Sequence, residues 1–264
     1  MSTATLPPPR RTRSALGPIN PIFIRYELSR RLNRQTLIFT LLLPAALYLA
    51  LFRTGGTDAE LPHGNFAAWM MIGMAIYGAA TASTSSAATV SIERSVGWLR
   101  TIRLSPLSST AYVLIKVLCS VIVAALPVGV VGVLGALTGA EAKPQVWVIS
   151  LAVAWLGSAV FAALGIALGL ALKPEIVMHM PGLTMTVLAF LGNLFIPLSG
   201  VMLTISQFTP MYGVATLARY PLTDGYNFHG EHSSLLGALI NLAAWLAVFT
   251  VAAARRFADS TGRV

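Results

Sequence analysis

The stretch SIERSVGWLRTIRLSPLSSTAYVLIK, residues 91–116, decides how the rest of the chain folds. It lies between two apolar runs, residues 66–89 and 117–139, that contain no Asp, Glu, Lys or Arg. Each run is long enough to cross the roughly 30 Å hydrocarbon core of a bilayer as a helix. The stretch carries Glu93, Arg94 and further arginines, so it cannot lie in lipid. Its basic excess predicts a cytoplasmic position.

Apolar side chains lie among the charges of this loop. Trp98 and Leu99 stand directly before Arg100, and Arg103 follows three residues later. Two interpretations are open. The loop is either a docking surface for a soluble partner, or a solvated turn that only connects two helices. Its composition alone does not decide between them.

The composition of the whole chain indicates an integral membrane protein. Of the 264 residues, 56% are hydrophobic and only 10% are charged, whereas a soluble domain has about 25% charged residues. The mean hydropathy is +0.74. A net charge of +9 would suggest nucleic acid in a soluble protein. Here the basic residues flank apolar runs, so membrane topology explains them and no nucleic-acid partner is predicted.

The predicted fold is an all-α integral membrane protein with six transmembrane helices. Residues 1–20 form a disordered basic tail, and residues 21–35 an amphipathic helix lying in the cytoplasmic interface; an extension of the first span is the alternative. A coupling loop at 91–110 joins spans two and three, and a cytoplasmic tail occupies 255–264. The six spans of the transmembrane domain, residues 36–254, are predicted at 36–52, 66–90, 112–137, 146–172, 176–198 and 235–254.

Residues 199–234 are too mixed for a span and too apolar for a simple loop. We expect two short helices within residues 199–220 that dip into the outer leaflet and return, because such backbone is tolerated where protein or water surrounds it. Six spans put both termini on one side. Only Arg53, Lys143 and Arg219 among the 18 basic residues then fall on the opposite side, which predicts cytoplasmic termini.

Small and hydroxylated residues crowd the second half of span two, at residues 81–89. They allow close helix packing, and we favour that role over contact with a substrate. Gly165 and Gly169 form a GxxxG pair, which predicts close helix contact inside the subunit. The residues that could line a pathway are Thr81, Thr84, Ser85, Asn193 and Phe195.

The sequence lacks the usual signatures of other transport and catalytic chemistries. All nine acidic residues lie in predicted tails, loops or span ends, whereas ion-coupled carriers usually need ionisable groups within the bilayer. No lysine follows a glycine, so a Walker A motif is excluded. We predict no catalytic residue, no metal site and no cofactor bound by this chain.

Three stretches together resemble the membrane subunits of ATP-binding-cassette transporters of the type 2 exporter family. Residues 25–34, before an apolar span with Pro44, look like that family's interfacial helix. Residues 92–116 look like its coupling helix, and residues 205–219 like its outer re-entrant helices. The likeness covers nearly the whole chain from about residue 20.

The resemblance implies a permease in the inner membrane of a bacterial cell. A second permease subunit, identical or related, would complete the pathway, and two separate ATPase subunits would carry ATP and Mg. The cargo would be a drug, antibiotic, lipid or similar amphiphile, as in multidrug efflux. The resemblance assigns ATPase coupling to Glu93, Arg94, Trp98, Leu99, Arg100, Arg103 and Leu104, and an outer gate to Phe208, Pro210 and Tyr212. An ATP-independent carrier or channel, and a membrane-anchored enzyme or sensor, are the competing readings.

Overall fold

The computed structural model describes residues 21–31, 34–52, 60–97, 109–226, 228 and 230–262, and these are mostly helical. The long and medium helices are α1 (Pro21–Arg31), α2 (Arg34–Leu51), α3 (Phe66–Ala88), α6 (Ser109–Leu137), α7 (Pro144–Ala171), α9 (Met180–Leu191), α11 (Pro210–Thr223) and α12 (Leu235–Gly262). The short elements are α4 (Val90–Ser95), α8 (Pro174–Val177), α10 (Gly200–Ser206), and the strands β1 (Glu60–Leu61) and β2 (Gly64–Asn65).

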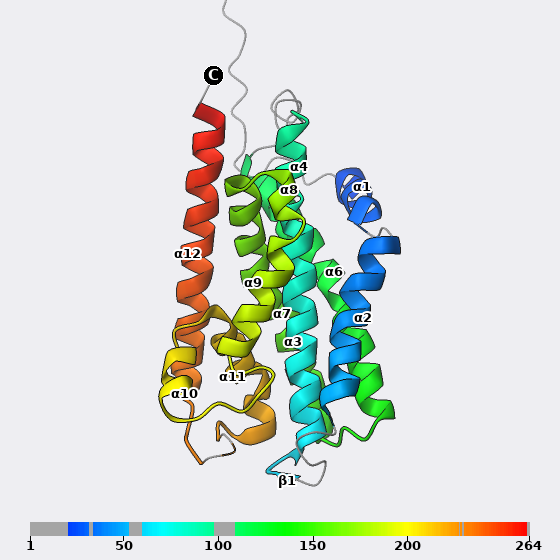
Figure 1. Cartoon of the computed structure of the whole chain (residues 1–264), viewed down its shortest axis with the longest axis vertical. Coiled ribbons are helices and arrows are strands. Elements are labelled where there is room, and N and C mark those ends of the chain that lie inside the picture. The colour runs from blue at the N-terminus through cyan, green and yellow to red at the C-terminus, as the bar shows by residue number, and fades with distance from the viewer. Residues whose placement is uncertain are drawn as a thin grey trace, which may run out of the picture.

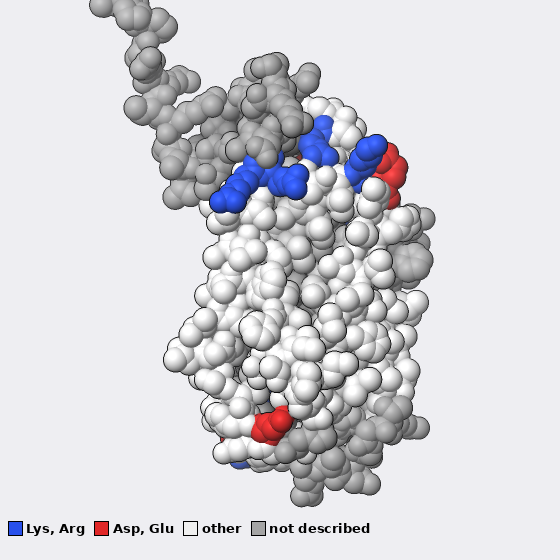
Figure 2. Space-filling model, turned by 60° about the vertical axis from the view of Figure 1, so that its left-hand side comes forward, with Lys and Arg blue, Asp and Glu red and all other residues white. Residues whose placement is uncertain are grey.

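The helices form an elongated bundle with two distinct ends (Figure 1). Helices α1, α4 and α8 and the C-terminal end of α12 lie at one end, which we call the α1 end. Helices α10 and α11 and the β1–β2 hairpin lie at the other, the α11 end. Figure 2 shows Lys and Arg gathered at the α1 end, above a broad belt of uncharged residues. This charge distribution suits a bundle that crosses a membrane.

Within the described residues, four helices are long and apolar enough to cross a membrane: Phe66–Ser95, Ala111–Leu137, Pro144–Ala171 and Leu235–Phe257. Two shorter apolar helices, Thr40–Leu51 and Met180–Leu191, lie within α2 and α9. The multi-pass membrane architecture is therefore confirmed, whereas the layout of six spans stays a prediction.

Helix α3 is the centre of the bundle, and nearly all of its residues are buried. A Cβ placed on Gly165 or Gly169 of α7 would lie 2.4 Å from the Thr84 carbonyl oxygen or 2.6 Å from that of Ala88. The GxxxG pair thus brings α7 against the backbone of α3, as the sequence predicts for a contact inside the subunit. Gly78 allows the same kind of close helix contact on another side of α3, where Pro44 of α2 and Pro127 of α6 approach it.

The structure corrects the predicted fifth span, residues 176–198. Instead of one continuous helix, α8 ends at Val177, α9 runs from Met180 to Leu191, and turns follow. Pro181 lies at the start of α9 and cannot donate the backbone hydrogen bond that would continue α8. At the other end, Asn193 has a left-handed φ of 62°, and its Oδ1 accepts a hydrogen bond from the Leu198 amide at 2.8 Å.

Other boundaries differ less from the prediction. The expected helix at 21–35 ends at Arg31, and α2 begins at Arg34. Two short helices, α10 and α11, occupy the expected re-entrant segment. The loop expected at 53–65 contains the β1–β2 hairpin, and α12 continues well beyond residue 254 into the expected tail.

Candidate functional site

Five charged residues meet at the α1 end, and we call them the junction cluster: Glu27, Arg30, Arg31, Glu93 and Lys116. They come from α1, α4 and α6. Glu93 of α4 accepts hydrogen bonds from Lys116 and Tyr112 of α6 and from Arg30 Nη2 of α1 at 3.0 Å. One carboxylate therefore joins three helices.

Glu27 is the second carboxylate of the cluster. Arg31 donates to Glu27 Oε1 from Nε at 2.9 Å, as expected for charges four residues apart on a helix. Lys116 donates to the same oxygen. Arg31 Nη1 also donates to the hydroxyls of Ser86 on α3, at 2.5 Å, and Ser120 on α6, at 2.6 Å. These bonds attach α1 to both neighbouring helices.

Four members of the cluster are buried and Arg30 is partly exposed, and the charges are matched by contact with one another. Buried charges are stable only when they are paired and hydrogen-bonded. Burial alone would raise the pKa of Glu27, but the positive charges of Lys116 and Arg31 outweigh burial and hold that pKa below its ordinary value of 4.5. Burial likewise opposes charge on Arg30, but the Glu93 carboxylate raises the pKa of the guanidinium above its ordinary value.

Helix α4 is also fixed to α7. Arg94 donates from both terminal nitrogens to carbonyl oxygens at the C-terminal end of α7, those of Leu170 and, at 2.9 Å, Leu172. Ser91 Oγ donates to the Leu172 oxygen at 3.0 Å. The last carbonyls of a helix lack intrahelical partners and carry partial negative charge. Arg94 therefore caps α7 and holds α4 against it.

The structure revises the position of Glu93 among the predicted coupling residues. Its side chain is only 2% exposed, so it positions α4 from within and cannot itself form a docking surface. Arg94 is half-buried and bonded to α7. The remaining predicted coupling residues, Trp98, Leu99, Arg100, Arg103 and Leu104, lie outside the described residues.

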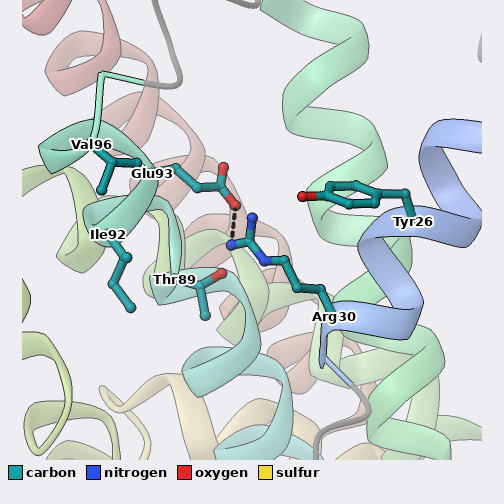
Figure 3. Close-up of a pocket in the computed structure, with 6 residues that line it drawn as sticks. All are labelled: Tyr26, Arg30, Thr89, Ile92, Glu93 and Val96. Carbon is teal, nitrogen blue, oxygen red and sulfur yellow. Dashed lines mark hydrogen bonds and ion pairs between the residues drawn. The ribbon is translucent and has the colours of Figure 1, made fainter.

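A cavity of about 500 Å³ opens beside the junction cluster. One wall comes from α1 and the other from the end of α3 and α4, as Figure 3 shows. The Arg30 side chain spans the cavity toward Glu93, and the Tyr26 hydroxyl points toward the Arg30 guanidinium (Figure 3). The residues that line it are Tyr26, Arg30, Thr89, Ile92, Glu93 and Val96.

The predicted outer-gate residues lie together where α10 meets α11. Phe208 is exposed, whereas Pro210 and Tyr212 are buried. Pro210 begins α11, where a missing N–H carries no cost. The Tyr212 hydroxyl donates to Ser233 Oγ at 3.1 Å.

Helix α12 holds the turn between α10 and α11 in place. Asn241 Nδ2 donates to the Gln207 carbonyl at 2.7 Å, and Trp245 Nε1 to the Phe208 carbonyl at 3.0 Å. The gate role of this turn stays a prediction, and its attachment to α12 is an observation.

Arg219 of α11 is a functional candidate that the sequence analysis missed. The sequence places it on the outer side, within the expected re-entrant segment, and assigns it no role, whereas the structure buries it with only 4% of the residue exposed. Its guanidinium lies 3.4 Å from the centre of the Trp69 ring. It donates to the backbone oxygens of Trp69 at 3.3 Å, Asn193 at 2.5 Å and Leu194 at 2.9 Å. We call this arrangement the Arg219 site.

The Arg219 site joins α11 to α3 and to the turn after α9, and it has a sequence signal. Arg219 is the single charged residue of α11, and an ionisable residue in an apolar membrane segment usually has a specific role. Gly73 makes room for it, because a Cβ there would lie 2.3 Å from Arg219 Nη2.

The residues predicted to line a pathway are not gathered at one surface of this chain. Thr84 is fully buried and donates to the Phe161 carbonyl at 3.1 Å, which is a packing contact between α3 and α7. Phe195 is buried against Tyr77 and Phe190. Asn193 forms the turn after α9, and Thr81 and Ser85 are half-buried on α3.

Comparison with known proteins identifies the family. Residues 22–222 match the family model described as "ABC-2 type transporter". The chain is 28% identical over 196 residues to "Putative transport permease YvfS" of Bacillus subtilis (strain 168), which covers 70% of this chain and 78% of the relative. The chain therefore belongs to the ABC-2 type transporter family, as a transporter permease.

Proposed function

We propose that this permease is the membrane subunit of an ATP-driven exporter that moves a hydrophobic or amphiphilic small molecule, such as a drug, antibiotic or lipid, out of the cell. Two separate ATPase subunits dock from the cytoplasm on residues 91–110 and carry ATP and Mg. A second permease subunit, identical or related, forms the pathway with this one. The α1 end faces the cytoplasm of a bacterial cell, so both termini lie there.

The attachment of α4 carries this proposal. Helix α4 comes directly before the proposed coupling residues in the chain, and it is bonded to α1 and α6 through Glu93 and to α7 through Arg94. A force applied by a soluble motor to the coupling segment therefore reaches three helices at once. A turn that only connects two spans would not need a buried carboxylate shared by three helices.

The test separates coupling from folding. Trp98→Ala removes an aromatic anchor of the kind that dominates interfaces, and Arg100→Glu reverses a charge on the same segment. We expect normal abundance of both variants, at least tenfold less ATPase copurified from native membranes, and loss of export. Lys173→Glu, in an exposed turn at the same end, controls for charge reversal alone and should keep both.

Wild-type ATPase association together with full export in the Trp98 and Arg100 variants would contradict the proposal. Such a result would favour an ATP-independent carrier or channel. Turnover of a substrate by the purified chain without any partner would favour an enzyme instead.

A further inference from the structure

Among the described residues that line the cavity beside the junction cluster, one charged side chain is accessible, and it is positive. The Arg30 side chain is 40% exposed, whereas the Glu93 side chain across from it is 2% exposed. Glu93 already accepts from Arg30, Tyr112 and Lys116, so it has little capacity left for a cationic ligand. A ligand entering the cavity therefore meets the guanidinium and not the carboxylate.

Charge balance favours an anion as well. Among the described side chains of the junction cluster, three cations face two carboxylates. Arg30 uses only Nη2 for Glu93, and a guanidinium has five N–H donors in a planar fork that matches phosphate and carboxylate oxygens. The Tyr26 hydroxyl, which points to the guanidinium (Figure 3), supplies a further donor beside it.

The opposite wall of the cavity is apolar. Ile92 and Val96 of the α4 segment line it, and both are exposed. The volume of the cavity, about 500 Å³, lies within the usual range for small-molecule sites. The cavity therefore has a cationic wall on α1 and an apolar wall at α4, at the α1 end of the bundle. This combination suits a molecule with an anionic head and an apolar body. Free phosphate would contact the cationic wall and would leave the apolar wall uncovered.

We propose that this cavity binds the phosphate headgroup of an anionic lipid, with Arg30 and Tyr26 contacting the phosphate and Ile92 and Val96 contacting the glycerol and the start of the acyl chains. The sidedness of the site rests on the proposed function, which places α1 in the cytoplasmic leaflet, where anionic lipids attract basic residues. Binding at Arg30 competes with the Arg30–Glu93 ion pair. The lipid therefore adjusts how firmly α1 is attached to α4.

Lipid binding by the purified full-length chain, without any ATPase, tests this site independently of the transport proposal. Native mass spectrometry in a neutral detergent would follow titration with phosphatidylglycerol. We expect Arg30→Gln to weaken phosphatidylglycerol binding roughly tenfold, as loss of charge-assisted hydrogen bonds predicts. Arg25→Gln is the matched control, because Arg25 is exposed on the same helix but does not line the cavity; it should change binding less than twofold.

Three further arms complete the experiment. Phosphatidylcholine should bind much more weakly than phosphatidylglycerol, and equal binding would overturn the proposal. Inorganic phosphate at the same concentration should not displace the lipid, and full displacement would assign the site to free phosphate. Val96→Asp, at an exposed position, should repel the headgroup and weaken binding even if Arg30→Gln fails to fold, and unchanged binding would overturn the proposal.

The alternative occupant is an acidic side chain of a protein partner. If Arg30→Gln binds phosphatidylglycerol like the wild type but loses copurified ATPase, the cavity belongs to that partner and the lipid proposal is wrong. Equal losses in Arg25→Gln and Arg30→Gln would show that general positive charge, rather than this cavity, attracts the lipid.

Discussion

The two ends of the bundle bury positive charge in different ways. At the α1 end, Lys116 and Arg31 are matched by the full charges of Glu27 and Glu93. At the α11 end, Arg219 contacts carbonyl dipoles and the face of Trp69, with no carboxylate among its partners in the described part of the chain. Full charges neutralise one another strongly but leave a large penalty if one is removed. Dipoles and an aromatic ring give a weaker match that involves no titrating acid.

The two ends also differ in which helices the buried cations hold together. The junction cluster joins α1, α4 and α6 through side chains of opposite charge, and Arg94 adds α7 through backbone carbonyl oxygens. The Arg219 site links α11 to the backbone of α3 and of the turn after α9. A backbone acceptor cannot be removed by substitution, whereas each charged side chain of the junction cluster can be replaced. The comparison is therefore testable one side chain at a time.

The largest expected effect comes from Lys116→Met, which leaves Glu27 and Glu93 facing each other in the interior without their shared cation. Removing one partner of a buried ion pair costs about 3–5 kcal/mol. We expect a large drop in the thermal unfolding midpoint of the purified protein in detergent. Lys173→Met, at an exposed position, should change stability by less than about 0.5 kcal/mol.

Repulsion between the two carboxylates, rather than side-chain volume, should govern this loss. Adding Glu93→Gln to Lys116→Met removes one of the two carboxylates that Lys116 bridges and should restore part of the stability. A double variant less stable than Lys116→Met alone would contradict the electrostatic account of the junction cluster.

A smaller effect is expected at the other end from Arg219→Met. The three carbonyl oxygens lose their donors, which costs stability, but the variant also removes the cost of burying a guanidinium without a carboxylate. We expect a net loss of about 2 kcal/mol in unfolding free energy. Arg219→Lys should recover little of it, because an ammonium cannot reproduce the planar fork that reaches three oxygens.

Gly73→Ala tests the same site without removing the charge. Its Cβ would lie 2.3 Å from Arg219 Nη2 and 2.8 Å from the Leu194 oxygen. Gly182→Ala, in α9, is the matched control, since nothing lies within 4 Å of a Cβ there. Equal stability of the two alanine variants would mean that the guanidinium can shift freely, and the Arg219 site would lose its role in fixing α11.

The sequence predicted the membrane architecture well because hydrophobic runs and charge-free lengths are local properties. The runs at 66–89 and 117–139 lie in α3 and α6. The two helices expected within residues 199–220 are α10 and α11, because Pro210 and the mixed composition are local signals as well. The break within the predicted fifth span was harder to predict from the sequence. Pro181 was visible, but prolines also occur inside α2 and α6 without ending them, so proline alone did not decide.

The junction cluster and the Arg219 site could not be predicted from the sequence, for a different reason. Glu27 and Arg31, and Tyr112 and Lys116, are each four residues apart and predict pairs on one helix face. That the faces of α1, α4 and α6 meet is a tertiary fact, set by packing around α3. The role of Arg219 could not be predicted because its acceptors are backbone oxygens, and a backbone acceptor leaves no mark in the sequence.

The last and smallest expected effect is a difference in acid sensitivity between the two ends. In the folded protein the pKa of Glu27 is held below its ordinary value of 4.5. A carboxyl group with a lowered folded pKa stabilises the protein fully above its unfolded pKa, and this contribution is lost as pH falls through the folded pKa. Below about pH 4.5 the junction cluster should therefore weaken, whereas no carboxylate contacts the guanidinium at the Arg219 site among the described residues.

Measurement of unfolding midpoints between pH 7 and pH 3.5 would resolve this difference. Glu27→Gln should start from a lower midpoint at pH 7, because the carboxylate charge is gone, and should lose less on acidification than the wild type. Arg219→Met should keep the wild-type pH dependence, because its site contains no titrating acid. The same slope in Glu27→Gln and in the wild type would mean that the charge on Glu27 contributes nothing to stability, and that Glu27 holds α1 to α6 by hydrogen bonding alone.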